Sequence, residues 1–214
     1  MTKSYVLNYI LFSGPDGSGK TTLSYLLKIH FSSRGFRVRY HWLRGSHLFA
    51  SLLARFLPLF NVFSGVDNPY YSLRIPSSFR IIWLFIEFIS FIPVYILRRI
   101  LAIFYNILVC DRGLLDFISW VISTTRYPGF LTTLYGRFLI RLHTKESIIY
   151  VYASPDILLR RADVPKDFLM REYTIYNVLK KYSNVSFSID TSYDTPIKSL
   201  AKIINCLRMK YGFD

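Results

Sequence analysis

Residues 14–21 read Gly14-Pro15-Asp16-Gly17-Ser18-Gly19-Lys20-Thr21 and match the pattern G-x-x-x-x-G-K-[ST] of a phosphate-binding loop. Before this loop, Tyr5 to Ser13 is an apolar, β-branched and aromatic run that is typical of a buried strand. After it, Thr22 to Ser33 carries apolar residues at helical spacing. A chance glycine-rich turn needs neither neighbour, whereas a phosphate-binding loop needs both. The sequence therefore predicts that this segment binds the phosphates of a nucleoside triphosphate.

The residue types of the loop explain how it would hold a triphosphate. Glycines allow backbone N–H groups to turn inward around a phosphate, and the N-terminus of the following helix adds partial positive charge. We expect the residues from Gly14 to Thr22 to contact the nucleotide. Lys20 would reach the β- and γ-phosphates, and the Thr21 hydroxyl would bind Mg²⁺. The expected cofactors are therefore ATP and Mg²⁺.

The length and charge of the chain limit what surrounds this loop. Its 214 residues suit one α/β domain with a full hydrophobic core. The excess of 27 Lys and Arg over 13 Asp and Glu gives a formal net charge of +14, which favours anionic partners such as nucleotides, nucleic acid or an acidic membrane surface. Two cysteines are too few for a disulfide framework, which indicates a reducing, cytoplasmic location. The apolar N-terminus is similar to a signal peptide but leads directly into the loop, which favours a strand.

Strands and helices alternate along the rest of the chain. This alternation predicts a parallel sheet covered by helices on both faces, a three-layer, doubly wound α/β fold with about five strands. No internal repeat, low-complexity tract or interdomain linker interrupts it, so we expect a single domain over residues 1–214. The further strands are expected at Arg37–Trp42, Asn106–Cys110, Ser147–Ala153 and Val185–Ile189, and the helices include Leu131–His143, Asp167–Lys181 and Thr195–Leu207.

A second chemical signal, Asp111-Arg112, directly follows the strand at Asn106–Cys110. Ligands of open α/β sheets bind at the carboxyl ends of the strands, so this pair should face the phosphate-binding loop. Asp111 can hold Mg²⁺ directly or through water, and Arg112 offers a planar fork to a phosphate oxygen. The structural alternative is a strand-capping Asp beside a surface Arg. The position of the pair relative to the loop favours the functional interpretation.

A third signal is the basic segment that follows the strand at Ser147–Ala153. It carries Arg160, Arg161, Lys166 and Arg171 around a short break at residues 163–165. Cations on a closing segment stabilise the negative charge that phosphoryl transfer spreads over the transferring group. Most such charge runs are solvated helix faces, and that alternative stays open for each arginine. We expect at least one member of the cluster to reach phosphate.

Together these segments resemble the thymidylate kinase family of P-loop nucleoside monophosphate kinases. The resemblance covers nearly the whole chain, and the phosphate-binding loop is its most specific part. It rests on GPDGSGKTT at 14–22, Arg44 after the second strand, CDR at 110–112, SPDILLRR at 154–161, FLMREYTIYNVL at 168–179 and IDTSYDTPIKSLAKII at 189–204.

The resemblance implies roles for individual residues. In that family an acidic residue inside the loop lies near the acceptor sugar and phosphate, and Asp16 occupies this position. An arginine after the second strand grips the acceptor phosphate, which points to Arg44, and Asp111-Arg112 matches the family's Asp-Arg pair. The resemblance further implies an acceptor-binding helical region at about residues 45–105 and a lid at about residues 158–171.

The family also supplies a basic residue to the transferring phosphate, either from the loop or from the lid. This loop has none between Gly14 and Gly19, so Arg160, Arg161 or Arg171 should supply it. The expected catalytic residues are therefore Lys20, Asp16, Arg112 and Arg161. The implied activity is the ATP- and Mg²⁺-dependent transfer of a phosphoryl group to a nucleoside monophosphate, with dTMP as the expected acceptor. Because an acceptor phosphate is already anionic, no strong general base is needed.

Base recognition departs from the family pattern. The family places a Phe and, four residues later, an Arg on the long helix before the Asp-Arg pair, where they stack on and hydrogen-bond thymine. Phe85 could stack here, but no arginine follows it, and the helix instead carries Glu87. The aromatic residue common after the Asp-Arg pair is Gly113, and the family's Tyr-Gln pair is replaced by Trp120-Val121. Thymine is therefore in doubt as the base that this site binds.

Two long apolar stretches, Leu48 to Phe63 and Ile81 to Leu97, occupy the expected acceptor region. A membrane span needs about 20 apolar residues, and the second stretch is shorter and contains Glu87 and Pro93. Packing against a second copy in a homodimer is the preferred interpretation, and an apolar acceptor pocket or contact with a membrane surface is the other. Buried in such a helix, Glu87 would need a partner or a raised pKa, which suggests a role at the acceptor site.

Two other functional classes remain open. One is a related P-loop kinase that acts on an apolar or membrane-associated phosphate acceptor. The other is a nucleic-acid-associated ATP-binding protein without small-molecule turnover, whose sign would be steeply salt-dependent polynucleotide binding. The placement of the basic residues in the lid favours a phosphate acceptor over nucleic acid.

Overall fold

The central element of the protein is a five-stranded parallel sheet. A computed structural model describes residues 9–43 and 45–212. The strands lie in the order β2-β4-β1-β5-β6, and every neighbouring pair is parallel. Their bounds are β1 (Tyr9–Ser13), β2 (Val38–Trp42), β4 (Ile107–Asp111), β5 (Ser147–Tyr152) and β6 (Asn184–Asp190). The predicted doubly wound α/β class is therefore confirmed, and each predicted strand has a counterpart in the sheet. Residues 5–8 of the first predicted strand lie outside the described residues.

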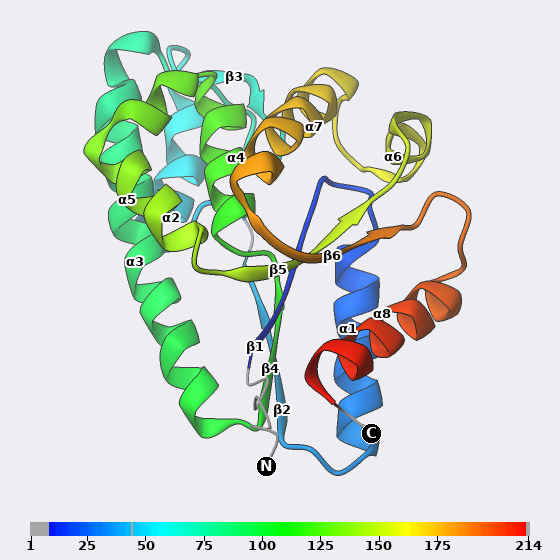
Figure 1. The fold of residues 1–214 in the computed structure, drawn as a ribbon. Coiled ribbons are helices and arrows are strands. Elements are labelled where there is room, and N and C mark those ends of the chain that lie inside the picture. The colour runs from blue at the N-terminus through cyan, green and yellow to red at the C-terminus, as the bar shows by residue number, and fades with distance from the viewer. Residues whose placement is uncertain (1–8, 44, 213–214) are drawn as a thin grey trace.

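Helices cover both faces of the sheet (Figure 1). Side chains alternate along the central strand β1, where Ile10 and Phe12 belong to one core cluster and Leu11 to the other. One face carries α1 (Lys20–Ser33) and α8 (Pro196–Tyr211). The opposite face carries α3 (Arg80–Phe104), α4 (Leu114–Thr125), α5 (Leu134–His143) and α7 (Lys166–Leu179). The predicted three layers follow from this arrangement.

Helix α4 is absent from the predicted helices because it lacks the usual pattern. All twelve of its residues are buried, since it lies between α3, α5 and α7. Its polar residues are buried as well as its apolar ones, so their spacing does not mark an exposed face from which the helix could be predicted. Asp116 is its one charged residue, and this residue reaches the phosphate-binding loop.

The apolar stretch at 81–97 lies within α3, a helix of 25 residues that contains Pro93. It buries Trp83, Glu87 and Phe91 toward the core, while Ile81 and Phe104 are among the large apolar side chains left exposed. By length and composition, the helical segment Ser77–Phe104 could cross a membrane, and 28% of its most apolar window is buried in the protein. The expectation of a largely apolar helix is confirmed, and most of its outer face has no cover within the described chain.

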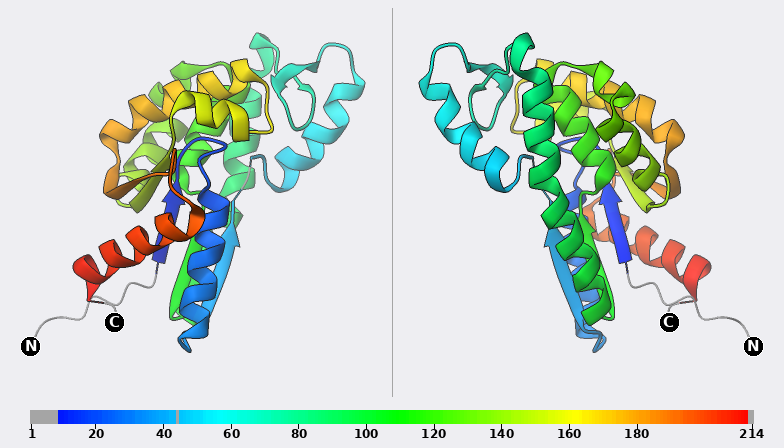
Figure 2. Two further views of the ribbon diagram at one scale, coloured as in Figure 1. Left: turned by 90° about the vertical axis from the view of Figure 1, so that its right-hand side faces the viewer. Right: turned by 90° about the vertical axis from the view of Figure 1, so that its left-hand side faces the viewer.

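The other apolar stretch becomes α2 (Leu48–Phe56) and the short helix η1 (Leu57–Leu59). A two-stranded hairpin follows, in which Gly65 N–H donates to Ser72 O at 3.0 Å and Arg74 N–H donates to Phe63 O at 2.7 Å. We call residues 63–74 the β3 hairpin, after β3 (Ser64–Asn68). Figure 2 shows α2 and this hairpin projecting beyond the sheet at the end where the strands have their carboxyl ends.

The remaining elements are short. They connect the helices and strands that line the site. Their bounds are η2 (Ser77–Phe79), η3 (Pro128–Thr132), α6 (Pro155–Arg161) and η4 (Lys180–Tyr182).

Candidate functional site

The phosphate-binding loop lies at the carboxyl end of β1, where its shape depends on glycine. A Cβ added to Gly14 would lie 1.9 Å from the Val151 carbonyl oxygen of β5, so only glycine lets the loop pass this strand. Gly19 has a φ of 88° and a left-handed conformation directly before α1. The loop therefore leads into the α1 N-terminus, whose free N–H groups favour an anion.

Lys20 is folded into this loop. Its side chain is buried, and Nζ donates a hydrogen bond to the Pro15 carbonyl oxygen at 2.6 Å. Burial, together with the nearby Arg112 guanidinium, lowers the pKa of Lys20 below its ordinary value. A phosphate oxygen placed in the loop would give this ammonium an anionic partner in place of the neutral Pro15 carbonyl.

Asp111 ends β4 beside the loop and meets the requirements of a Mg²⁺ ligand. One carboxylate oxygen, Oδ2, accepts a hydrogen bond from the Tyr40 hydroxyl at 2.9 Å. The other, Oδ1, is buried and has no hydrogen-bond partner among the residues that the structure describes. An unpartnered buried carboxylate oxygen is costly on its own and suits a hard cation. Thr21 is exposed at the first turn of α1, and its hydroxyl is the second candidate ligand.

Asp16 and Arg112 form an ion pair between the loop and the end of β4. Arg112 Nη2 lies 2.5 Å from Asp16 Oδ1, and both side chains are mostly buried. Burial alone would raise the pKa of Asp16, but Arg112 and Lys20 outweigh it and hold this pKa well below the usual range. Arg112 itself has a φ of 74°, an uncommon conformation for a residue other than glycine and one that recurs at functional sites.

The β3 hairpin contributes Tyr70 to the same group, a contact that sequence analysis missed. The Tyr70 hydroxyl donates to Asp16 Oδ2 at 2.7 Å, and its ring lies 5.6 Å from that of Trp120. One carboxylate oxygen of Asp16 thus pairs with Arg112, and the other accepts a hydrogen bond from Tyr70. The two partners are 54 positions apart in the sequence, which explains why no local pattern predicted the contact.

Two buried carboxylates, also missed, support the loop from α4 and α7. Asp116 accepts hydrogen bonds from Ser13 Oγ at 2.6 Å, from Gly113 N–H at 2.8 Å and from Tyr176 Oη at 2.7 Å. Glu172 accepts from the Asp16 N–H at 3.0 Å. Asp116 therefore ties β1, α4 and α7 together under the loop. Its position three residues after Gly113, at the start of α4, was the available sequence signal.

Burial dominates the electrostatics of Glu172. Together with the negative charge of Asp16, it raises the pKa of Glu172 to about 8. Near neutral pH this carboxyl therefore tends to hold its proton, while Asp16 stays ionised against Arg112. Two neighbouring carboxyls in different protonation states are a common feature of functional sites.

A cleft of about 460 Å³ opens next to the Asp16–Arg112 pair. We call it the Trp120 cleft. Its volume lies within the range of small-molecule sites, and Tyr70 and Trp120 also border Asp16 and Arg112 in the adjoining space. The expected ligand Arg44 precedes Gly45 in the sequence and lies outside the described residues. The lining residues are Trp42, Gly45, Ser46, Arg55, Tyr70, Tyr71 and Trp120.

Glu87 supports the floor of this cleft. Its carboxyl is buried, and Oε1 accepts a hydrogen bond from the hydroxyl of the lining residue Ser46. Burial raises the pKa of Glu87 to about 7, and the hydrogen bond from Ser46 opposes this rise. Glu87 is thus buried and has a partner in Ser46, as expected for a carboxyl inside an apolar helix.

The expected stacking residue Phe85 lies elsewhere. Its side chain is 44% exposed, and its ring lies 5.8 Å from Tyr135 of α5. The reason is helical phase: Trp83 and Glu87 are four residues apart and share a face of α3, whereas Phe85 is about half a turn away. We therefore correct the expectation that Phe85 stacks on an acceptor base, since Trp83 and Trp120 are the aromatic residues near Glu87.

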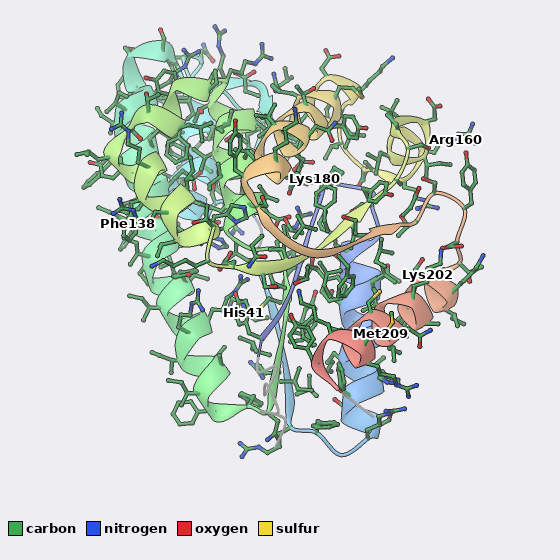
Figure 3. All side chains as sticks on the ribbon, in the orientation of Figure 1. His41, Phe138, Arg160, Lys180, Lys202 and Met209 are labelled. Atoms are coloured by element: carbon green, nitrogen blue, oxygen red, sulfur yellow. The ribbon has the colours of Figure 1, made fainter. Side chains whose placement is uncertain are left out.

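The three lid arginines point to three different places. Arg161 donates to the Thr191 carbonyl oxygen at 3.1 Å and lines a cavity of about 250 Å³ together with Gly19 and Thr22 of the loop. Arg171 is half-buried, with its guanidinium carbon 5.9 Å from the centre of the Phe168 ring. Arg160 is exposed on the outer side of α6 (Figure 3). Of the three, Arg161 is the one that shares a cavity with residues of the phosphate-binding loop.

Position 113 explains one departure from the family pattern. A Cβ added to Gly113 would lie 2.6 Å from Leu11 Cδ2. An aromatic side chain here would need the core under β1 to rearrange. The close packing of Leu11 is therefore compatible with glycine at this position.

Comparison with solved structures places the fold. No family model matches the chain, and no curated protein does either. Thymidylate kinase from Candida albicans is similar with a TM-score of 0.62 and 11% sequence identity, over 94% of this chain and 91% of that one. Deoxyadenosine kinase from M. mycoides, solved with bound dCTP, has a TM-score of 0.51 and 15% identity over 94% and 99% of the two chains. Thymidylate kinase from Ehrlichia chaffeensis has a TM-score of 0.51 and 18% identity over 93% and 97%. The chain has the fold of the P-loop nucleoside monophosphate kinases, as the sequence resemblance implied.

Proposed function

We propose that this protein transfers the γ-phosphoryl group of ATP, with Mg²⁺, to the phosphate of a nucleoside monophosphate, and that dTMP is the first acceptor to test. The observation that carries the proposal is the Asp16–Arg112 ion pair, held between the phosphate-binding loop and the Trp120 cleft. Such a position suits groups that bring a second phosphate next to the first.

Each residue of the site has its own role in the proposed reaction. Lys20 exchanges its Pro15 carbonyl for the transferring phosphoryl group, and Thr21 with Asp111 would hold Mg²⁺, which neutralises charge on the β- and γ-phosphates. Arg112, with Arg44, binds the acceptor phosphate, and Asp16 orients the acceptor. An acceptor phosphate oxygen then forms the new bond to the γ-phosphorus while the bond to the β,γ-bridging oxygen breaks and ADP leaves.

Arg161 is the lid residue that we assign to the donor nucleotide. It is the basic side chain of the lid that borders the loop residues Gly19 and Thr22. Its hydrogen bonds to the Thr191 hydroxyl at 3.3 Å and to the Thr191 carbonyl at 3.1 Å hold it there. Arg160 and Arg171 then serve other purposes.

The test is a screen of ADP release from ATP and Mg²⁺ over all nucleoside monophosphates. We expect one or a few acceptors to raise ADP release well above the rate without acceptor. Arg112→Lys is the informative variant, because it keeps a charge but loses the fork that holds Asp16 and a phosphate together. If no nucleoside monophosphate stimulates the wild type, the acceptor class is wrong; if Arg112→Lys matches the wild type, the assigned site is wrong.

A second candidate is transfer to an apolar or membrane-associated phosphate acceptor. The observation that favours it is the outer face of α3, where Ile81, Ile82, Phe85, Ile96 and Ile103 are each more than two-fifths exposed. Sedimentation with anionic vesicles and protection by dTMP against thermal unfolding separate the two candidates. Vesicle binding without dTMP protection supports this second acceptor class.

The same apolar face supports a homodimer as the assembly of the protein. Large exposed apolar patches on soluble proteins mark interaction surfaces, and α2 adds Phe49 and Phe56 to those of α3. Sedimentation velocity over a range of concentrations tests it. A monomer at all concentrations would contradict this assembly.

A further inference from the structure

A separate cavity of about 500 Å³ lies beside the β3 hairpin, apart from the catalytic groups. We call it the arginine cavity. Both arms of the hairpin, the start of α3 and the end of α4 line it, and its charged lining residues are Asp67, Arg74, Arg80 and Arg126. Neither the phosphate-binding loop nor Arg112 lines it. Its volume is in the range of cavities that hold small ligands.

The basic groups of this cavity outnumber the acidic ones. Asp67 pairs with Arg126, whose Nε lies 2.6 Å from Asp67 Oδ1. Arg74 and Arg80 form no ion pair with any residue in the described parts of the chain, 9–43 and 45–212. The Arg80 Nε is buried and lacks a hydrogen-bond partner there. A buried cationic donor without an acceptor is unfavourable unless a ligand supplies the acceptor.

The backbone holds these arginines in place. A Cβ on Gly65 would lie 2.6 Å from Arg74 Cβ and 3.3 Å from its Cδ, so glycine leaves the room in which the Arg74 side chain crosses the hairpin. Arg126 has a φ of 50° at the end of α4, and its pair with Asp67 fixes the hairpin to that helix. Guanidinium groups that are fixed before a ligand arrives lose less conformational entropy on binding it.

Arg171 of α7 adds a fourth positive charge at the edge of this group. Its Nε is also buried without a hydrogen-bond partner in the described chain. Burial, followed by the proximity of Arg126, lowers the pKa of Arg171, while Asp67 opposes this. Four arginines therefore lie near two carboxylates, Asp67 and Asp167, and a bound anion would reduce the repulsion among the excess positive charges.

We propose that the arginine cavity binds a phosphate-bearing anion with two or more negative charges. Guanidinium forks match phosphate oxygens in pairs, and the lining residues Ser64 and Ser77 offer hydroxyl donors beside them. No residue that the structure describes lines both the arginine cavity and the Trp120 cleft, so the two sites are distinct. The anion is either a soluble phosphate ester or the headgroup of an anionic lipid.

Inorganic pyrophosphate is the probe that tests the site. The phosphate-binding loop is first filled with Mg²⁺ and a non-hydrolysable ATP analogue, so that it does not bind the probe. Isothermal titration calorimetry of the full chain should then show one equivalent of bound pyrophosphate. The double variant Arg74→Gln/Arg80→Gln should weaken this binding by tenfold or more and leave ATP-analogue binding unchanged.

The matched control removes the same charge elsewhere. Arg137→Gln/Arg141→Gln changes two exposed arginines of α5 that do not line the cavity, and it should weaken pyrophosphate binding less than twofold. Because Arg80 is partly buried, the single variant Arg74→Gln, at an exposed position, serves if the double variant does not fold, and it should weaken binding at least threefold. No bound pyrophosphate in the wild type, or equal losses in the variant and its control, overturns the proposal.

Two further arms identify the source of the anion. Phosphatidylcholine vesicles doped with phosphatidylinositol bisphosphate are sedimented with the wild type and with Arg74→Gln/Arg80→Gln. If only the wild type binds the vesicles, and if pyrophosphate displaces it from them, the site binds a lipid headgroup. Pyrophosphate binding without vesicle binding assigns it to a soluble phosphate ester.

Discussion

Replacing Glu172 by Gln tests how the buried charges of the site affect stability. The Glu172 carboxyl accepts the Asp16 N–H at 3.0 Å, and burial together with the charge of Asp16 raises its pKa to about 8. In an unfolded chain a glutamate has a pKa of about 4.3. Between these two values the folded protein keeps a proton that the unfolded chain has released. The free energy of unfolding must therefore fall as the pH rises through this range.

The size of the effect follows from the proton count. One proton held only by the folded state lowers the free energy of unfolding by about 1.4 kcal/mol per pH unit, or about 2.7 kcal/mol between about pH 5.5 and about pH 7.5. Gln keeps an oxygen that can accept the Asp16 N–H and carries no charge at either pH. The stability advantage of the wild type over Glu172→Gln should therefore shrink by about that amount across the interval.

Urea unfolding of both proteins at several pH values measures this difference. Asp163→Asn is the control, because Asp163 is an exposed carboxylate in the segment between α6 and α7. Its difference from the wild type should stay nearly constant with pH. A wild-type advantage over Glu172→Gln that does not change between the two pH values would refute the electrostatic reasoning.

Three substitutions test the other parts of the site. Lys20→Ala should lower phosphoryl transfer by about a hundredfold or more, because the ammonium that meets the transferring group is gone, while circular dichroism shows an unchanged fold; near-normal turnover would contradict its role. Tyr70→Phe removes a hydrogen bond to the Asp16 carboxylate and should raise the KM for the acceptor by about tenfold or more. The KM for ATP should stay unchanged and serves as the internal control. A change in the KM for ATP alone would assign Tyr70 to the ATP side of the site. Gly14→Ala should abolish binding of a fluorescent ATP analogue, because the new Cβ would lie 1.9 Å from the Val151 carbonyl oxygen; retained binding would show that the loop can move away from β5.

Local pattern was enough to predict the central strands and the loop between them. Strands β1, β4 and β5 are short apolar runs, and their burial on both faces gives the continuous apolar signal of a parallel sheet. The loop at 14–21 was predicted because its glycines and its lysine have fixed spacing. Asp111 and Arg112 followed from the rule that ligands lie at the carboxyl ends of strands.

Local pattern failed where one residue type filled a whole segment. In α3 most positions are apolar, and in α4 the polar residues are buried together with the apolar ones, so the pattern does not say which side chain faces inward. The assignment of Phe85 to the acceptor site came from the family resemblance, which did not show on which face of α3 this residue lies. The buried carboxyl of Glu87 was the reliable guide, because a charged residue inside an apolar helix needs a specific partner.

The sequence by itself determined the class of fold, the phosphate-binding loop and the Asp-Arg pair, because these depend on short spacings and on the order of strands and helices. Only the tertiary structure decided what surrounds Asp16: Tyr70 comes from 54 residues away and Glu172 from 156. The arginine cavity likewise joins a hairpin, α3 and α4. Such contacts depend on how the chain packs over the sheet, and packing of distant segments leaves no periodic trace in the sequence.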